Sequence, residues 1–168
     1  MYSNCKEVII YCDNYANSTE HVRVGSRSII MKENKILLSH ETKIDQWMIP
    51  GGGIEENETL LECCIREAGE ETGLAVEPKN CYLKIDEYFA DWNFINYYFI
   101  CEVTGTAEIK LTEREMQVGA VCKWVEFEEA VNLFAHYQDY AETNEDRKGL
   151  YFREYTALME LIKLRDKK

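Results

Sequence analysis

The chain has 168 residues, of which 46% are hydrophobic and 30% are charged, and its formal net charge is −12. This length and composition are typical of an ordinary soluble protein, and we expect a single domain over residues 1–168. The negative charge argues against a broad nucleic-acid interface, which needs clustered Lys and Arg, but it leaves room for a small phosphorylated ligand whose charge is balanced by metal ions.

The first third of the chain is rich in strand patterns. Residues 7–12 form a short candidate strand, and Arg27–Met31 and Lys35–Ser39 are predicted strands joined by a hairpin turn. Another short strand, Trp47–Ile49, leads into three consecutive glycines, Gly51–Gly53. Because glycine has no Cβ, these residues allow a sharp turn and a close approach to a ligand, although a plain loop would also contain them.

A helix is expected after the glycines. Asn57 or Thr59 is the predicted N-cap, and Thr59 with Glu62 has the spacing of a capping box. Gly73 can adopt positive φ and is the predicted stop. The helix should therefore run from about residue 58 to about residue 72.

Three glutamates of this helix form one cluster. At about 100° per residue, Glu70 and Glu71 lie about 60° to one side of Glu67 and about 40° to the other. The cluster borders a predicted buried stripe, whose members are Leu61, Cys64, Ile65, Ala68 and Thr72. A solvated acidic face is the alternative, but like charges at these spacings repel by a few tenths of a kcal/mol. A hard divalent cation, Mg²⁺ or Mn²⁺ rather than zinc, would relieve the repulsion.

The stretch also matches a known motif. Gly52 is followed by five residues, Glu58, seven residues and the run REAGEETGL at 66–74. This order resembles the Nudix box, G-x5-E-x7-R-E-U-x-E-E-x-G-U, at all nine specified positions across 23 residues. A match of this length is far more specific than a lone glycine motif, and the Trp47–Gly52 lead-in resembles the family as well.

The resemblance implies a fold and an activity. The fold is an α/β/α sandwich of the α+β class, with a mixed sheet flanked by the Nudix-box helix and the C-terminal helices. The activity is Mg²⁺-dependent hydrolysis of a nucleoside diphosphate linked to another moiety, with Mn²⁺ as a substitute metal. Its substrate is a small nucleotide-type molecule, and we expect no nucleic-acid or membrane partner.

The resemblance also implies roles for individual residues. Glu67, Glu70 and Glu71 are the expected metal ligands, and Glu58 and Arg66 the expected structural ion pair. The loop of Gly51, Gly52 and Gly53 is expected to approach phosphate or metal, in part through a backbone carbonyl. Glu67 and Glu70 are both candidate catalytic residues. Glu67 is the first candidate for the general base because it lies between the other two carboxylates, but the sequence does not separate ligand from base.

The region after the helix is predicted to hold a second hairpin and an acidic loop. Glu77–Asn80 is a predicted loop, and Cys81–Ala90 and Phe94–Val103 are predicted strands around Asp91-Trp92-Asn93. Glu113 and Glu115 lie in a polar stretch before the predicted strand at residues 121–127. Related Nudix enzymes often draw an extra ligand or base from such a loop, and we favour Glu115 as this catalytic residue. An exposed acidic loop is the alternative.

Several aromatic residues are candidates for stacking on a nucleobase, above all Trp47 and Trp92, alongside Tyr88, Phe89, Phe94 and Tyr97. Aromatic residues in strands more often belong to the core, and Trp92 at the predicted hairpin tip is the least expected to do so. The C-terminal part, about residues 128–168, is predicted to form two helices, at 128–140 and 152–164, joined by a charged loop at 141–148.

The cellular compartment is inferred from what the sequence lacks. No apolar run reaches the roughly 18 residues that span a bilayer, and the N-terminus has no signal-peptide pattern. The seven cysteines form no C-x-x-C pair and are expected to be reduced and mostly buried. We therefore expect a cytoplasmic protein.

Two questions stay open from the sequence. One is whether the chain is an enzyme or a catalytically inactive binding or regulatory module, although such a module would be expected to lose box glutamates and this chain keeps them. The other is the substrate, although Phe89 occupies the position where ADP-ribose hydrolases of the family often carry proline. Oligomeric state is also open.

Overall fold

In the computed structural model, which describes residues 5–166, eight strands form one mixed sheet. The strands are β1 (Lys6–Tyr11), β2 (His21–Lys32), β3 (Lys35–Glu41), β4 (Gln46–Met48), β5 (Gly51–Gly53), β6 (Leu74–Phe89), β7 (Trp92–Thr106) and β8 (Ala120–Glu126). Their order is β1-β6-β7-β2-β3-β4, with β5 paired to β2 and β8 to β3. The β1–β6 and β2–β7 pairs are parallel and the others antiparallel.

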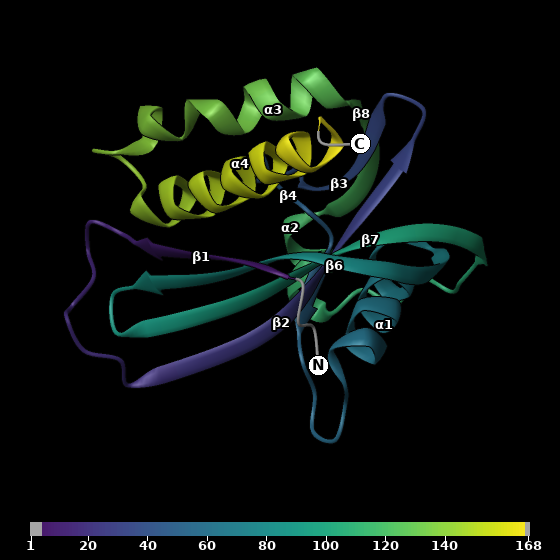
Figure 1. Ribbon diagram of the computed structural model, residues 1–168, viewed down its shortest axis with the longest axis horizontal. Coiled ribbons are helices and arrows are strands. Elements are labelled where there is room, and N and C mark those ends of the chain that lie inside the picture. Colours follow the sequence, from purple (N-terminus) through teal and green to yellow (C-terminus); the bar gives the residue numbers. More distant parts are fainter. Residues whose placement is uncertain (1–4, 167–168) are drawn as a thin grey trace.

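Helices cover both faces of the sheet (Figure 1). They are α1 (Leu60–Thr72), α2 (Glu113–Val118), α3 (Phe127–Ala135), the 3-10 helix η1 (His136–Tyr140) and α4 (Glu145–Arg165). Helices α3 and α4 lie together on one side, and α1 lies on the other. The predicted α+β class and the sandwich of a mixed sheet between helices are confirmed.

Strand alternation builds two cores from neighbouring residues. Successive side chains of a strand point to opposite faces, so Ile29 and Tyr98 enter the core under α3 and α4, and Ile30 and Phe99 enter the core under α1. Each of these four side chains is at most 1% exposed. The sheet is therefore the shared wall that fixes α1 relative to α4.

Helix α1 has the predicted ends but a different buried face. Thr59 and Glu62 form the capping box, and Gly73 ends the helix with φ of 72°. The predicted buried stripe is right for Cys64 and Ala68, which are buried, and wrong for Leu61 and Ile65, which are 39% and 45% exposed. Cys63 and Gly69, outside the predicted stripe, are buried as well. The glycine loop packs on α1, where Cys63 Sγ donates to Gly52 O at 3.6 Å. Because of this contact, the buried face of α1 lies nearer to the glutamates than predicted.

Two predicted loops are wrong. Residues 77–80 belong to β6, where Pro78 is accommodated because the β6–β7 register shifts between Pro78 and Asn80. The polar stretch containing Glu113 and Glu115 is helix α2, which Thr112 caps and Gly119 ends. At six residues, α2 is too short to leave a periodic pattern in the sequence.

Smaller boundaries also differ from prediction. Helix α4 begins at Glu145 inside the predicted charged loop, because Asn144 caps it by accepting from Arg147 N at 3.0 Å. The hairpin turn is Ala90–Asp91, with Ala90 at φ 49°, so Trp92 is the first residue of β7 and pairs with Phe89.

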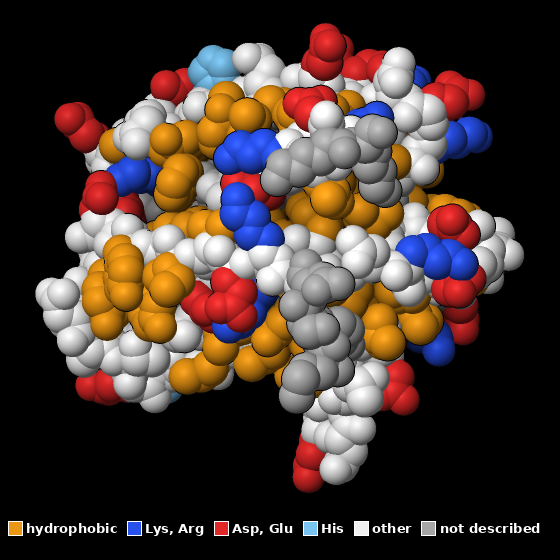
Figure 2. Space-filling view, viewed as in Figure 1, with side chains coloured by type: hydrophobic (Ala, Val, Ile, Leu, Met, Phe, Trp, Pro, Cys, Tyr) orange, Lys and Arg blue, Asp and Glu red, His pale blue; other side chains and the backbone are white. Residues whose placement is uncertain are grey.

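Part of the surface is apolar. Figure 2 shows hydrophobic side chains gathered over β1, the strand in which Ile9 is 58% and Tyr11 is 62% exposed. Tyr11 stacks on Tyr88 of β6, with ring centroids 4.9 Å apart. Among the described residues, no helix combines the length and apolar character needed to span a bilayer.

Candidate active site

Arg66 joins helix α1 to the loop before it. Its Nε donates to Glu58 Oε1 at 2.7 Å and its Nη2 to Glu58 Oε2 at 2.9 Å, a two-point pair that lowers the pKa of Glu58. Nη2 also donates to Gly53 O at 3.0 Å. The remaining nitrogen, Nη1, reaches Glu67 Oε1 at 2.8 Å and Glu70 Oε2 at 3.1 Å. One guanidinium therefore fixes the loop, the helix and two of the three clustered glutamates.

Glu67 lies directly against the glycine loop. A Cβ on Gly52 would stand 2.3 Å from Glu67 Oε1, closer than any real contact, so only glycine leaves room for this carboxylate. Burial raises the pKa of Glu67, and the Arg66 contact partly opposes that shift. Glu67 is thus a carboxylate with increased basicity, held against the backbone of Gly52.

Glu71 lies deeper than the other two. Its Oε2 accepts a hydrogen bond from Gly51 N at 3.2 Å. Burial raises its pKa to about 8, although the positive charge of Arg27 acts in the opposite direction. Glu71 therefore lacks a close cationic partner that would compensate for its desolvation.

The facing wall comes from α2 and the end of β3. Arg114 Nη1 pairs with Glu41 Oε1 at 2.6 Å, and the Glu41 side chain is only 3% exposed. Glu115 lines the cavity while its Oε2 accepts from Thr112 N at 2.6 Å. Its charge contributes to the raised pKa of Glu71. Glu113 does not line the cavity.

These walls enclose a cavity of about 500 Å³. Its carboxylates are Glu41, Glu55, Glu67, Glu70, Glu71 and Glu115, and its cationic side chains are Arg23, Arg27, Arg66, Lys110 and Arg114. The rest of the lining is Ser39, Met48, Gly51, Gly52, Thr112 and Ala120. Glu58 and Gly53 are bound to Arg66 behind this lining. The mixture of many carboxylates with several cations suits a ligand that combines a polyanion with divalent metal ions.

The donor set fits a hard cation by its chemistry. Glu67, Glu70, Glu71 and Glu115 offer carboxylate oxygens, the ligand type of Mg²⁺ and Mn²⁺. The backbone carbonyls of the loop are engaged elsewhere, since Gly51 O accepts from Arg27 Nη1 at 2.8 Å and Gly52 O accepts from Cys63 Sγ at 3.6 Å.

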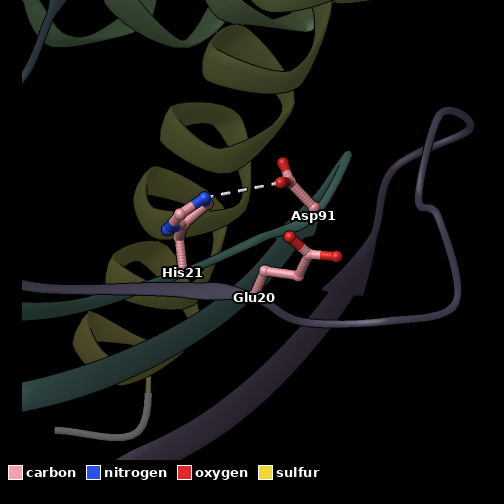
Figure 3. A group of neighbouring side chains, drawn as sticks. All are labelled: Glu20, His21 and Asp91. Atoms are coloured by element: carbon pink, nitrogen blue, oxygen red, sulfur yellow. Dashed lines mark ion pairs between the residues drawn. The ribbon is translucent and has the colours of Figure 1, made fainter.

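A second acidic group lies at the other end of the sheet. Glu20, His21 and Asp91 bring one ligand atom each within 4.8 Å of the others, the one such group found among residues 5–166 (Figure 3). His21 Nε2 and Asp91 Oδ2 are 3.6 Å apart. Glu20 and His21 are exposed, and acidic groups of this kind are common without an ion, so we assign no metal to them.

Two arginines of β2 line the cavity although the sequence did not predict them as site residues. Arg27 donates to Gly51 O and Asn96 Oδ1, and Arg23 lies beside Gly53. Within residues 5–166, neither has a carboxylate at ion-pair distance. Arg23 and Arg27 are four residues apart in VRVGSRS, so in a strand their side chains point to the same face. The predicted strand begins only at Arg27, so it does not include Arg23.

The two candidate stacking residues are found in different places. Trp47 stacks on His40, with ring centroids 3.8 Å apart, and it lines none of the cavities described here. Trp92 stacks on Phe94 at 5.4 Å and lines a separate cavity of about 500 Å³. Of the two tryptophans, Trp92 is therefore the one that lines a described cavity.

Sequence comparison identifies relatives of this arrangement. The family model described as NUDIX domain matches residues 20–146, which include the whole glycine loop, α1 and α2. The phosphatase NudJ of Escherichia coli strain K12 is 28% identical over 113 residues, covering 65% of this chain and 70% of that protein.

Solved structures share the fold. A UDP-X diphosphatase superposes with a TM-score of 0.59 at 16% identity, covering 85% of this chain and 64% of the other. A NUDIX-family hydrolase from Clostridium perfringens superposes with a TM-score of 0.53 at 21% identity, covering 83% of this chain and 97% of the other. At these identities the likeness extends to the fold alone.

Proposed function

The chain belongs to the NUDIX family, and from that premise we propose that it is a Mg²⁺-dependent hydrolase that cleaves the diphosphate of a nucleoside diphosphate linked to another moiety. The observation that carries the proposal is the convergence of Glu67, Glu70, Glu71 and Glu115 with Arg23 and Arg27 on one cavity. The diphosphatase and phosphatase names of its relatives agree with chemistry at phosphorus.

In this proposal, Glu67, Glu70 and Glu71 hold the metal, with Glu115 as an additional ligand or base. When bound, Mg²⁺ or Mn²⁺ neutralises the negative charge that develops on the phosphoryl oxygens and lowers the pKa of water. Arg66 Nη1 contacts only Oε2 of Glu70, so Oε1 of Glu70 is available to a metal.

Glu67 is our candidate for the general base. A base works best when its pKa approaches the working pH, and burial moves the pKa of Glu67 in that direction. The Glu67 carboxylate is held in position by Arg66 and by its contact with Gly52. It is therefore preorganised to accept the proton of an attacking water.

The cations of β2 have a separate role. Arg27 is anchored by the carbonyl of Gly51 and the side chain of Asn96, and Arg23 is exposed at the same cavity. Both are suited to bind the substrate phosphates, since guanidinium groups pair with phosphate oxygens at two points.

A direct assay tests the proposal. The purified protein is incubated with nucleoside triphosphates, nucleotide sugars, ADP-ribose and dinucleoside polyphosphates, in Mg²⁺, in Mn²⁺ and in EDTA, and products are separated by chromatography. We expect a nucleoside monophosphate as product with metal and none in EDTA or with Glu71→Gln. Tight binding without hydrolysis of any substrate would instead identify an inactive nucleotide-binding module.

We also propose a reducing, cytoplasmic location. All seven cysteines are free, and Cys63, Cys64, Cys81 and Cys101 are buried. Free buried thiols are typical of reducing compartments.

A further inference from the structure

Three adjacent cavities lie in series from the glutamates to the Ala90–Asp91 turn. The glutamate cavity shares Arg23, Arg27 and Gly52 with a small neighbouring cavity of about 160 Å³. That cavity in turn shares Phe94, Leu150 and Arg153 with the cavity of about 500 Å³ that Trp92 lines. We call this last one the far cavity. A ligand that starts at the glutamates can therefore extend along β2 and β7 into the far cavity.

Strand register sets the order of groups along these cavities. In the parallel β2–β7 pair, His21 is level with Trp92, Arg23 with Phe94 and Arg27 with Tyr98. These residues alternate along their strands, so they share the face that α4 covers. At about 3.3 Å per residue, the Phe94 level lies roughly 13 Å from the Arg27 level. A nucleoside diphosphate can therefore place its phosphates between Arg27 and Arg23, with its base beyond Arg23 against Phe94 and Trp92.

The far cavity offers an aromatic surface. Trp92 and Phe94 stack with an interplanar angle of 7°, and Trp92 is 36% exposed. Phe89 and Leu150 add apolar walls. A planar ring can stack on such a surface, and base–aromatic stacking is favourable for every base.

The polar groups of the far cavity are mainly acceptors. It is lined by the carboxylates Glu87, Asp91 and Asp146, against one cation, Arg153. Arg153 already donates through Nε and Nη2 to Glu154 and through Nη1 to Glu87. Asp146 is exposed, and among the described residues no hydrogen bond or ion pair engages its side chain. The cavity is therefore matched to a neutral ring that carries N–H donors and is mismatched to an anionic group.

We propose that the far cavity is the nucleobase subsite and selects bases that carry an exocyclic amino group, with Arg23 binding the diphosphate between it and the glutamates. This inference rests on the proposed function for the identity of the diphosphate, but the binding of the base can be tested without hydrolysis.

The first experiment measures binding by calorimetry in EDTA. Two pairs of nucleoside monophosphates are compared, AMP with IMP and CMP with UMP, because the members of each pair differ by an amino group replaced by an oxygen. We expect the amino-bearing member of at least one pair to bind about ten-fold or more tightly than its partner. Equal affinities within both pairs would overturn the selectivity.

Variants locate the subsite. Trp92→Ala should weaken binding of the preferred monophosphate by about ten-fold, and Trp124→Ala, which removes a tryptophan of similar exposure (39%) from β8, should leave it unchanged. Asp146→Asn should reduce the preference for the amino group. Equal binding by Trp92→Ala and wild type, both folded by circular dichroism, would place the base elsewhere.

The role of Arg23 is tested by kinetics on the best substrate of the screen. Arg23→Ala should raise KM by about ten-fold, and Lys32→Ala, which removes a positive charge from the other end of β2, should not. An unchanged KM would overturn the assignment of Arg23. If the wild type binds AMP or CMP at Trp92 but hydrolyses no substrate, the proposed function fails and the subsite stands. If the wild type hydrolyses a substrate and Trp92→Ala has the same kinetics, the proposed function stands and the subsite fails.

Discussion

Gly52 and Glu67 are in such close contact that a Cβ on Gly52 would lie 2.3 Å from Glu67 Oε1 and 2.5 Å from its carboxyl carbon. Any residue other than glycine at position 52 would therefore place its Cβ where the Glu67 carboxylate lies. The obstructing atoms are the end of a flexible side chain, so a larger residue would move the carboxylate and leave the backbone in place.

Gly52→Ala should consequently fold but lose turnover. We expect its melting temperature to stay close to that of the wild type, and kcat to fall by about 100-fold, the scale associated with a misplacement of about 1 Å. Gly105→Ala is the control, because its Cβ would meet only Ala75 Cβ at an ordinary 3.9 Å. Full turnover by the Gly52 variant would show that the position of Glu67 is unimportant.

The ends of α1 could be predicted from the sequence because their causes are local. Thr59 and Glu62 cap each other across three residues, and Gly73 ends the helix through its own backbone angle. The buried face could not be predicted in this way. Leu61 and Ile65 are apolar yet exposed, because the packing of the glycine loop decides which side of the helix is covered.

The site was predictable from spacing where one segment supplies it, and the family resemblance added Glu115 from outside that segment. Glu67, Glu70 and Glu71 follow from their spacing on one helix, but Glu41, Arg23 and Arg27 reach the cavity through strand pairing across the sheet. A periodic pattern carries no information on such long-range pairing. Pro78 misled the prediction of β6 for a related reason, since a register shift lets the strand continue through it.

Loss of the Glu58–Arg66 pair should affect stability more than chemistry. The side chains are only 11% and 22% exposed, so Glu58→Ala leaves a guanidinium with unpaired donors, and we expect the free energy of unfolding to fall by about 2 kcal/mol. Urea unfolding in EDTA measures this value, and Glu56→Ala in the same loop is the exposed control.

The same variant has a defined pH dependence. Arg66 lowers the pKa of Glu58 in the folded state below its unfolded value of 4.5. The contribution of ionised Glu58 to the free energy of unfolding is therefore present above pH 4.5 and is lost as the pH falls through the folded pKa. The stability gap between wild type and Glu58→Ala should therefore narrow below pH 4.5. A gap that is constant with pH, or absent at pH 7, would argue against the ion pair.

Glu71→Gln should stabilise the metal-free protein at high pH. Burial raises the folded pKa of Glu71 from 4.5 to about 8, so wild-type stability is fully present below pH 4.5 and declines as pH rises toward 8. Glutamine does not ionise and can still accept from Gly51 N. In EDTA, the variant should match the wild type at pH 4.5 and melt several degrees higher at pH 8.

At pH 8, Mg²⁺ should make the melting temperature of the wild type higher than that of Glu71→Gln. A ligand that binds only the folded state raises its stability, so the wild type should gain melting temperature with Mg²⁺ and the variant should gain little. Turnover of Glu71→Gln should fall by at least 100-fold. Equal Mg²⁺ shifts in both proteins would remove Glu71 from the metal site.

The extra carboxylate provides the last test. Glu115 and Glu113 are two residues apart on α2, yet only Glu115 lines the glutamate cavity, where its charge acts on Glu71. Glu113 is exposed, and its Oε1 accepts from Gln117 Nε2 at 3.4 Å.

Glu115→Gln removes the carboxylate but keeps the helix cap, because glutamine can also occupy the third position of a capping box and accept from Thr112 N. The variant therefore tests the catalytic role of Glu115 apart from its capping role. We expect its kcat to fall by about 100-fold with a melting temperature within a few degrees of the wild type. Glu113→Gln, the matched change on the solvent side, should have wild-type kcat. Steady-state kinetics at saturating Mg²⁺ decides between them: full activity in both variants, or loss in Glu113→Gln alone, would leave the base to Glu67, Glu70 or Glu71.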